Sequence, residues 1–249
     1  MRAVTAFGHA AGTAFGHAAG TAFGHAAGPL GYAAGTAYRV VVPGTEMRML
    51  VLAADAKGCV GVDLDTGAFV RASHPRVDQP PGPFTVVSAE IAGPVEPPDA
   101  ARPEALELSG APETIGQMSL KRAERLLAPL HHPPHLPLLG LGANAVPYWT
   151  LTGDRPSVTL LELRHDPFLR WGPAGPECHF AWQGGPHELP LADRRLIRTF
   201  EAHGVTRPLK SEVQRVLGYR PRRLLVMLTA PLDGYCHKVV AALLPSARA

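Results

Sequence analysis

Residues 59–71, CVGVDLDTGAFVR, give the clearest indication of the fold. Val60, Val62 and Leu64 share one face of a strand in which small or polar residues take the alternate positions. Asp-Thr-Gly at 65–67 predicts a turn, because Asp accepts hydrogen bonds from nearby backbone amides and Gly adopts positive φ. Residues 68–71 then return as the partner strand, so the stretch predicts a β-hairpin.

Apolar runs on either side of this hairpin predict further strands. Residues 50–54 (LVLAA) form a short apolar run typical of buried strands, and 84–91 and 105–108 resemble it. Residues 75–83 are rich in Pro and predict a loop. These segments and the hairpin predict a first β-barrel-like unit over residues 47–114.

A different periodicity begins at residue 119. Leu120, Ala123 and Leu127 recur at helical spacing, while charged residues cover the opposite side. A pair of prolines after two histidines then stops the helix. The pattern predicts a helix over 119–130, inside a connecting segment rich in Pro, Leu and Gly at 115–146.

Residues 147–249 predict a second β unit with a short helical pair. The expected elements are strands at 158–163, 178–182, 187–191, 223–229 and 235–244, and helices at 192–203 and 209–217. The chain holds 26 Gly and 26 Pro in 249 residues, well above average usage, so turns are frequent and long helices are excluded. We therefore expect a mainly β (α+β) fold of two tandem barrel-like units.

The first 46 residues have a different composition. The octapeptide TAFGHAAG occurs three times without change, at 5–12, 13–20 and 21–28. A period of eight matches neither a helix nor a solenoid repeat, and its glycines disfavour helix. We expect a disordered tail over 1–46. Two alternatives stay open, namely weak metal binding by the tail histidines and a translation start at Met47 or Met49.

Three segments, in their order, resemble the bacterial dual-OB-containing domain family. They are residues 49–71 with the hairpin above, 180–190 with Phe-Ala-Trp and Glu-Leu-Pro, and 223–242 with Gly-Tyr-Cys-His-Lys at 234–238. Ala72 departs from the family pattern, which often has Pro there. The resemblance covers residues 47–245 in patches. It implies two tandem OB-like barrels and nucleic-acid binding.

The segment 194–223 is strongly basic. It has nine Lys or Arg against two Glu and carries +7, so the rest of the chain carries 3 − 7 = −4. Such an asymmetry predicts a phosphate-binding surface, although Arg is abundant throughout this chain. The predicted phosphate contacts are Arg194, Arg195, Arg198, Lys210, Arg215, Arg222 and Arg223.

Tyr235, His237 and Lys238 follow a predicted turn, and we expect them to contact bases or ribose, because aromatic rings stack on bases. Trp182 shares a strand face with Cys178 and Phe180, which predicts a place in the core instead. The leading hypothesis is a non-catalytic, cytoplasmic module that binds single-stranded nucleic acid.

Three alternatives stay open. The first is a protein-interaction or regulatory β domain without a nucleic-acid ligand. The second is a winged helix-turn-helix, because residues 192–217 predict two helices before a strand hairpin. The third is an aspartic protease with Asp65 in an Asp-Thr-Gly motif, which would need a second carboxylate from a dimer.

The sequence also argues against several classes of protein. It has no run of 18 apolar residues, so we expect no membrane span. Its three cysteines are too few for a disulfide scaffold and predict reduced, buried thiols. No phosphate loop, dinucleotide fingerprint or nucleophile elbow occurs, so we expect no cofactor. The histidines at 131, 132 and 135 lack ligand partners at metal-binding spacing, so we expect no metal.

Overall fold

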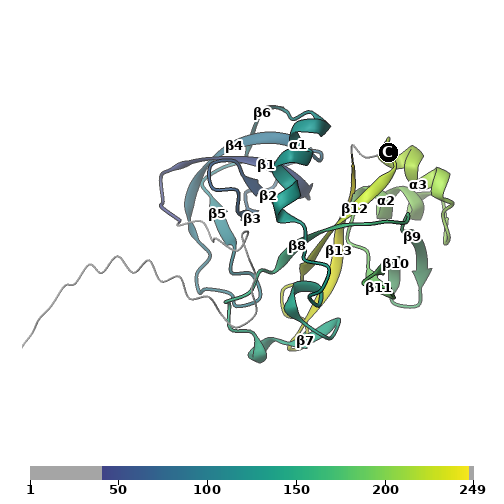
Figure 1. Ribbon diagram of the computed structural model, residues 1–249. Helices are drawn as coiled ribbons and strands as arrows, with labels where there is room; N and C mark the ends of the chain where they lie inside the picture. The colour runs from purple at the N-terminus through teal and green to yellow at the C-terminus, as the bar shows by residue number, and fades with distance from the viewer. Residues whose placement is uncertain (1–40, 247–249) are drawn as a thin grey trace, which may run out of the picture. The chain divides into compact units, whose positions relative to one another are not determined.

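A computed structural model describes residues 41–246 of the chain and shows a mainly β fold with a closed five-stranded barrel and a half-barrel (Figure 1). Most of the tail predicted for residues 1–46 lies outside the described residues. Its last part is ordered, since Gly44 N donates to Ile91 O and the first strand begins at Glu46. In the described part, no helix has the length and apolar character needed to cross a membrane.

The closed barrel has the strand order β1-β2-β3-β5-β4, and β4 pairs with β1 to complete it. The pair β3–β5 is parallel and the others are antiparallel. The sixth strand, β6, extends the sheet beyond β4. The bounds are β1 Glu46–Ala54, β2 Gly58–Asp63, β3 Phe69–Ser73, β4 Thr85–Pro94, β5 Ala105–Leu108 and β6 Glu113–Gln117.

Strand β1 is apolar on both faces because each face meets a different core. Met49 and Val51 lie in the barrel core, whereas Leu50 and Leu52 belong to a second core outside the barrel. Gly61 on β2 allows close approach to β1, since a Cβ there would lie 2.2 Å from Leu50 O. The continuous apolar run is therefore explained by burial on both sides.

The predicted hairpin is confirmed, but Asp63 stabilises its turn instead of Asp65. The Asp63 carboxylate accepts hydrogen bonds from Asp65 N and from Thr66 Oγ1. Gly67 adopts a φ of 72°, as the turn requires. Asp63 is fully buried. Its carboxylate provides the hydrogen-bond partner that the turn's Asp65 N and Thr66 Oγ1 need.

The predicted connecting helix is α1 (Leu120–Leu127), followed by a 3-10 turn over Ala128–Leu130. Ser119 occupies the N-cap position, but its side chain makes no capping hydrogen bond. Ala123 and Leu127 pack into the second core together with strands from the C-terminal half. The helix thus belongs to a core that the two halves share.

The half-barrel consists of a four-stranded sheet, β7-β13-β12-β8, and a three-stranded sheet, β11-β10-β9. The long strands β12 and β13 lie at its centre, and α2 and α3 lie beside them (Figure 1). The bounds are β7 Ala145–Pro147, β8 Val158–Glu162, β9 Phe168–Gly172, β10 Gly175–Trp182, β11 Gly185–Pro190, α2 Arg194–Ala202, α3 Lys210–Leu217, β12 Pro221–Leu228 and β13 Tyr235–Pro245.

Two cores flank the β12–β13 pair. Leu224 and Val226 face a core lined by both sheets and by α2, whereas Leu225 and Leu244 face the core shared with α1 and the barrel. Trp182 packs against the first of these cores, together with Cys178 and Phe180, as predicted. Because both faces of the pair are buried, the central sheet joins the two halves of the described chain.

Candidate functional site

A cleft of about 480 Å³ lies between the closed barrel and the half-barrel. Parts of β1, β2 and β3 and the Pro-rich loop line one side, and the start of α2 with β12 and β13 lines the other. The charged residues of its lining are five cations, Lys57, Arg71, Arg102, Arg194 and Arg195, and two acids, Asp55 and Asp193. The lining therefore carries a surplus of positive charge.

The two acidic residues of the lining are already engaged. Asp55 accepts hydrogen bonds from the backbone amides of Lys57 and Gly58, at 2.8 and 3.0 Å. Asp193 is the N-cap of α2, and its carboxylate lies 2.7 Å from Nη2 of Arg195. Burial opposes the charge of Arg195, but the bond and attraction of Asp193 outweigh it and raise the pKa of the guanidinium. Asp193 and Arg195 therefore form a structural pair.

Arg71 lies at the floor of the cleft. Its guanidinium donates to Leu228 O at 2.8 Å and to Ser157 Oγ at 3.0 Å. Burial lowers the pKa of Arg71 to about 10, opposed by the nearby Glu104 carboxylate. Burial raises the pKa of Glu104. Its Oε1 accepts a hydrogen bond from Ser157 N, whereas Oε2 has no hydrogen-bond partner in the described part. The floor thus holds a desolvated cation bonded to neutral groups.

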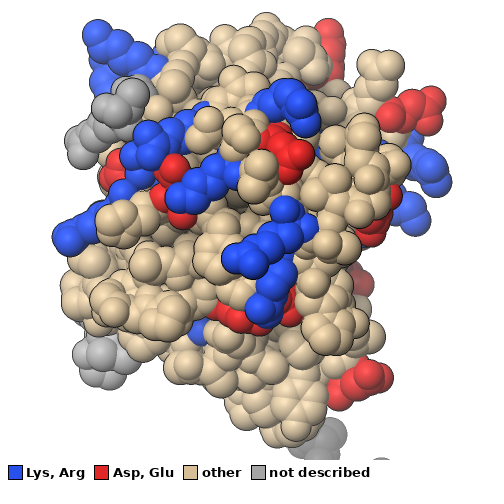
Figure 2. All heavy atoms as spheres, turned by 90° about the vertical axis from the view of Figure 1, so that its right-hand side faces the viewer, with Lys and Arg blue, Asp and Glu red and all other residues tan. Residues whose placement is uncertain are grey.

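Lys57 and Arg194 are the exposed cations of the cleft. Within residues 41–246, neither side chain has an ion pair. Arg198 lies one helical turn after Arg194 on α2 and is also exposed, so positive charge continues from the cleft along the helix. Figure 2 shows the side of the molecule on which Figure 1 places α2 and α3, where Lys and Arg side chains gather with Asp and Glu between them.

Of the other predicted phosphate contacts, Lys210 and Arg215 are exposed on α3. Arg222 donates to Arg164 O and lies near Asp166, which it shares with Arg220. Arg223 does not fit the prediction of a phosphate contact. It is only 1% exposed, and its Nη2 donates to Glu124 Oε1 at 2.7 Å.

The predicted base-contacting residues differ in their accessibility. Tyr235 is 42% exposed and forms an edge-to-face pair with Trp149, which is 70% exposed. His237 is half-buried. Lys238 is 2% exposed, and its Nζ donates to Leu141 O. Lys238 is therefore a buried structural residue, and the prediction of a ligand contact does not fit its position.

The basic helices and the aromatic residues lie toward opposite ends of β13. Arg195 and Tyr219 both donate to Leu243 O, eight residues after Tyr235, which corresponds to about 26 Å of strand. The structure does not place the two groups side by side. Tyr235, His237, Val239 and Ala241 alternate on the face of β13 between the two groups, and the last two side chains are buried.

Sequence reasoning missed Lys57, Arg71, Arg102 and Glu104. These residues come from separate segments of the barrel, and only its closure brings them opposite α2. No local spacing signals that these residues converge.

The other motifs have simple structural roles. Asp65 pairs with Arg48 at 2.7 Å on the exposed side of the hairpin, so its neighbour is a cation, where a protease would need a second carboxyl group. His132 is buried, with Nε2 near the carbonyl oxygens of Leu136 and Pro137. Burial lowers the pKa of His132. The tail histidines lie outside the described residues.

The chain was compared with family models, with curated proteins and with solved structures, and it matches none of them. The cleft and the surfaces around it are therefore the features from which a function can be inferred.

Proposed function

We propose that the protein is a non-catalytic module that binds single-stranded nucleic acid, with phosphates in the cationic cleft. One observation carries the proposal: Lys57 and Arg194 are exposed cations on the two sides of a cleft whose two acids already have hydrogen-bond or ion-pair partners in the lining. Phosphate groups are the common biological anions that such a surface attracts, and they bind chiefly through charge. We also propose that the closed five-stranded barrel is of the OB type, as the dual-OB resemblance implies.

The exposed aromatic pair supports a single strand as the ligand. Trp149 and Tyr235 present ring surface to solvent, and unpaired bases stack on such rings. Tyr235 lies at the start of β13, which continues to Ala241 in the cleft. One nucleic-acid strand could therefore place bases on the aromatic pair and phosphates near Arg194. A duplex hides its base faces and would lose this contribution.

The same aromatic surface favours a second candidate, a protein-interaction domain. Leu232 is 65% exposed beside the turn that leads to Tyr235 and adds apolar area there. Exposed apolar patches mark protein interfaces as well as ligand sites. In that case the aromatic patch, and not the cationic cleft, would carry the function.

We also propose that the protein resides in the cytoplasm, where thiols stay reduced. Cys59, Cys178 and Cys236 are free and buried. Burial raises the pKa of the Cys59 thiol to about 12, which keeps it protonated and unreactive. Three unpaired thiols in the described core support a cytoplasmic protein.

Fluorescence anisotropy of the full chain with labelled oligonucleotides tests the proposal. The probes are single-stranded DNA, single-stranded RNA and duplex of about 15 nucleotides, which covers the ~4–16 nucleotides typical of one OB domain. We expect salt-sensitive binding of a single strand. The double variant Lys57→Gln/Arg194→Gln should lower the slope of log K against log salt by about 1.4, or about 0.7 for each lost contact.

A matched variant controls for net charge. Lys121→Gln/Arg122→Gln also removes two exposed cations, but from α1, outside the cleft lining. It should leave the salt dependence within error of the parent. Equal effects of the two double variants would mean that charge acts without a defined site. Absence of binding to every probe at low salt would refute the proposal and favour the protein-interaction domain.

A further inference from the structure

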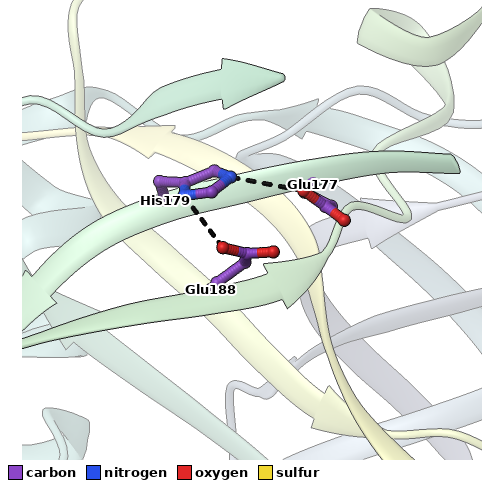
Figure 3. Close-up of side chains that lie close together, drawn as sticks. All are labelled: Glu177, His179 and Glu188. Carbon is purple, nitrogen blue, oxygen red and sulfur yellow. Dashed lines mark hydrogen bonds and ion pairs between the residues drawn. The ribbon is translucent and has the colours of Figure 1, made fainter. Parts of the chain in front are cut away.

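A cluster of two Glu side chains and one His side chain lies on the outer face of the three-stranded sheet, and none of the three lines the cleft. Glu177 and His179 alternate on β10, and Glu188 on β11 is the direct cross-strand partner of His179. The three side chains therefore project from the same face. Figure 3 shows the imidazole between the two carboxylates. Its Nε2 lies 3.4 Å from Glu177 Oε2, and its Nδ1 lies 3.4 Å from Glu188 Oε2.

Neighbouring residues hold this cluster in position. The ring of Phe168 stacks on His179, with centroids 4.5 Å apart and an interplanar angle of 18°. Gly172 leaves space for Glu177, because a Cβ at that position would lie 2.3 Å from its Oε1. The side chains of His179 and Glu177 are 13% and 16% exposed, whereas that of Glu188 is 50% exposed. The cluster is sheltered on one side and open to solvent on the other.

A cation already lies between the carboxylates. Nη2 of Arg170 is 3.0 Å from Glu177 Oε2 and 3.4 Å from Glu188 Oε1. The Arg170 side chain is 47% exposed and long, so it can leave the carboxylates for solvent. Its guanidinium marks a position where these residues stabilise positive charge.

We propose that Glu177, His179 and Glu188 form a zinc site in which the ion takes the position of the Arg170 guanidinium. Imidazole and carboxylates are ordinary Zn²⁺ ligands, and three protein ligands plus water complete a tetrahedral ion. One ligand atom from each residue lies within 4.8 Å of the others. Zinc bonds of ~2.0–2.2 Å need ligand atoms about 3.4 Å apart, so the ligand atoms move closer together by at most about 1.4 Å.

The two ring nitrogens have separate roles in this arrangement. Nε2 binds the ion beside Glu177 Oε2 and Glu188 Oε1. Glu188 Oε2 lies 3.4 Å from Nδ1, and the Glu188 carboxylate moves away from this nitrogen when its Oε1 binds an ion on Nε2. The inference does not depend on nucleic-acid binding, because no residue of this cluster lines the cleft.

Competition of the metal-free full chain with a chromogenic zinc chelator tests the site. The parent carries His9→Ala, His17→Ala and His25→Ala, so that the repeat histidines contribute nothing. We expect one zinc ion per chain. His179→Ala should weaken the affinity at least about 100-fold, beyond the range for loss of an orienting partner alone. His165→Ala, which removes another exposed histidine, should have no effect.

Two further variants keep the test informative if His179→Ala affects folding. Glu188→Gln changes a half-exposed carboxylate and should also reduce the affinity strongly. Arg170→Gln removes the competing cation and should tighten binding about fivefold. Unchanged affinity in both Glu188→Gln and His179→Ala would overturn the site. Weaker binding in Arg170→Gln would overturn the assignment of the ion to the guanidinium position.

Discussion

Replacing Lys238 by Met should stabilise the protein near neutral pH. The side chain is 2% exposed, and its Nζ donates to Leu141 O at 2.5 Å without an ion pair in the described part. Burial lowers the pKa of Lys238 from 10.5 to about 8. A shift of this size corresponds to about 3 kcal/mol of unfavourable free energy for the charged form. Loss of the bond to Leu141 O costs about 1 kcal/mol, so the net gain is about 2 kcal/mol.

The pH dependence has a definite sign. Below about pH 8 both the folded and the unfolded chain hold the proton on Lys238, so the full cost of burying the charge is present. Between about pH 8 and 10.5 the folded chain releases the proton and the unfolded chain keeps it, which raises the free energy of unfolding. The advantage of the Met variant should therefore shrink as the pH rises through this range.

Urea unfolding of the parent and of Lys238→Met, near pH 7 and near pH 9.5, measures the effect. The difference between the two proteins removes the contribution of groups that titrate in both. Lys57→Met is a matched control at an exposed lysine and should change little at either pH. A Met variant that is less stable near pH 7, or a difference that is the same at both pH values, would refute the reasoning.

Two further predictions concern a buried ion pair and the aromatic surface. Arg223→Met leaves Glu124 without its guanidinium partner and should lower the free energy of unfolding by about 3 kcal/mol. This value is near the low end for buried ion pairs because Glu124 is partly exposed. Adding Glu124→Met should recover most of this loss in the same urea titration. Trp149→Ala should weaken single-strand binding by ~1–3 kcal/mol because one base loses its stacking partner. The melting temperature of the protein should stay unchanged, since the Trp149 ring is 70% exposed. An unchanged anisotropy curve would contradict the stacking role.

Strands with a buried apolar face were predictable from the sequence, and the exposed or short ones were not. The hairpin at 59–71 and the strands at the C-terminal end were predicted because alternation or apolar runs record burial. Strand β6 is exposed along its whole length, so it carries no such pattern. Strands β7 and β9 were also missed, and β9 has only one fully buried residue, Leu169.

The candidate sites were less predictable than the fold. Counting charge identified Arg194 and Arg198, which are exposed, but it also selected Arg223, which is buried against Glu124. Counting cannot distinguish these cases, because exposure depends on which strand face meets a core. Glu177 and Glu188 were overlooked for a related reason: they meet His179 only through the register of β10 with β11.

The core shared by the two halves affects the order in which the chain can fold during synthesis. Leu50 and Leu244 lie in one core cluster although they are about 190 positions apart, so this contact has a very long sequence separation. Before β12 and β13 emerge from the ribosome, α1 and β8 are the described elements of the later chain that can already pack on the outer face of β1. A nascent barrel would therefore expose apolar surface until the last strand emerges, which makes it a candidate client for chaperones during translation.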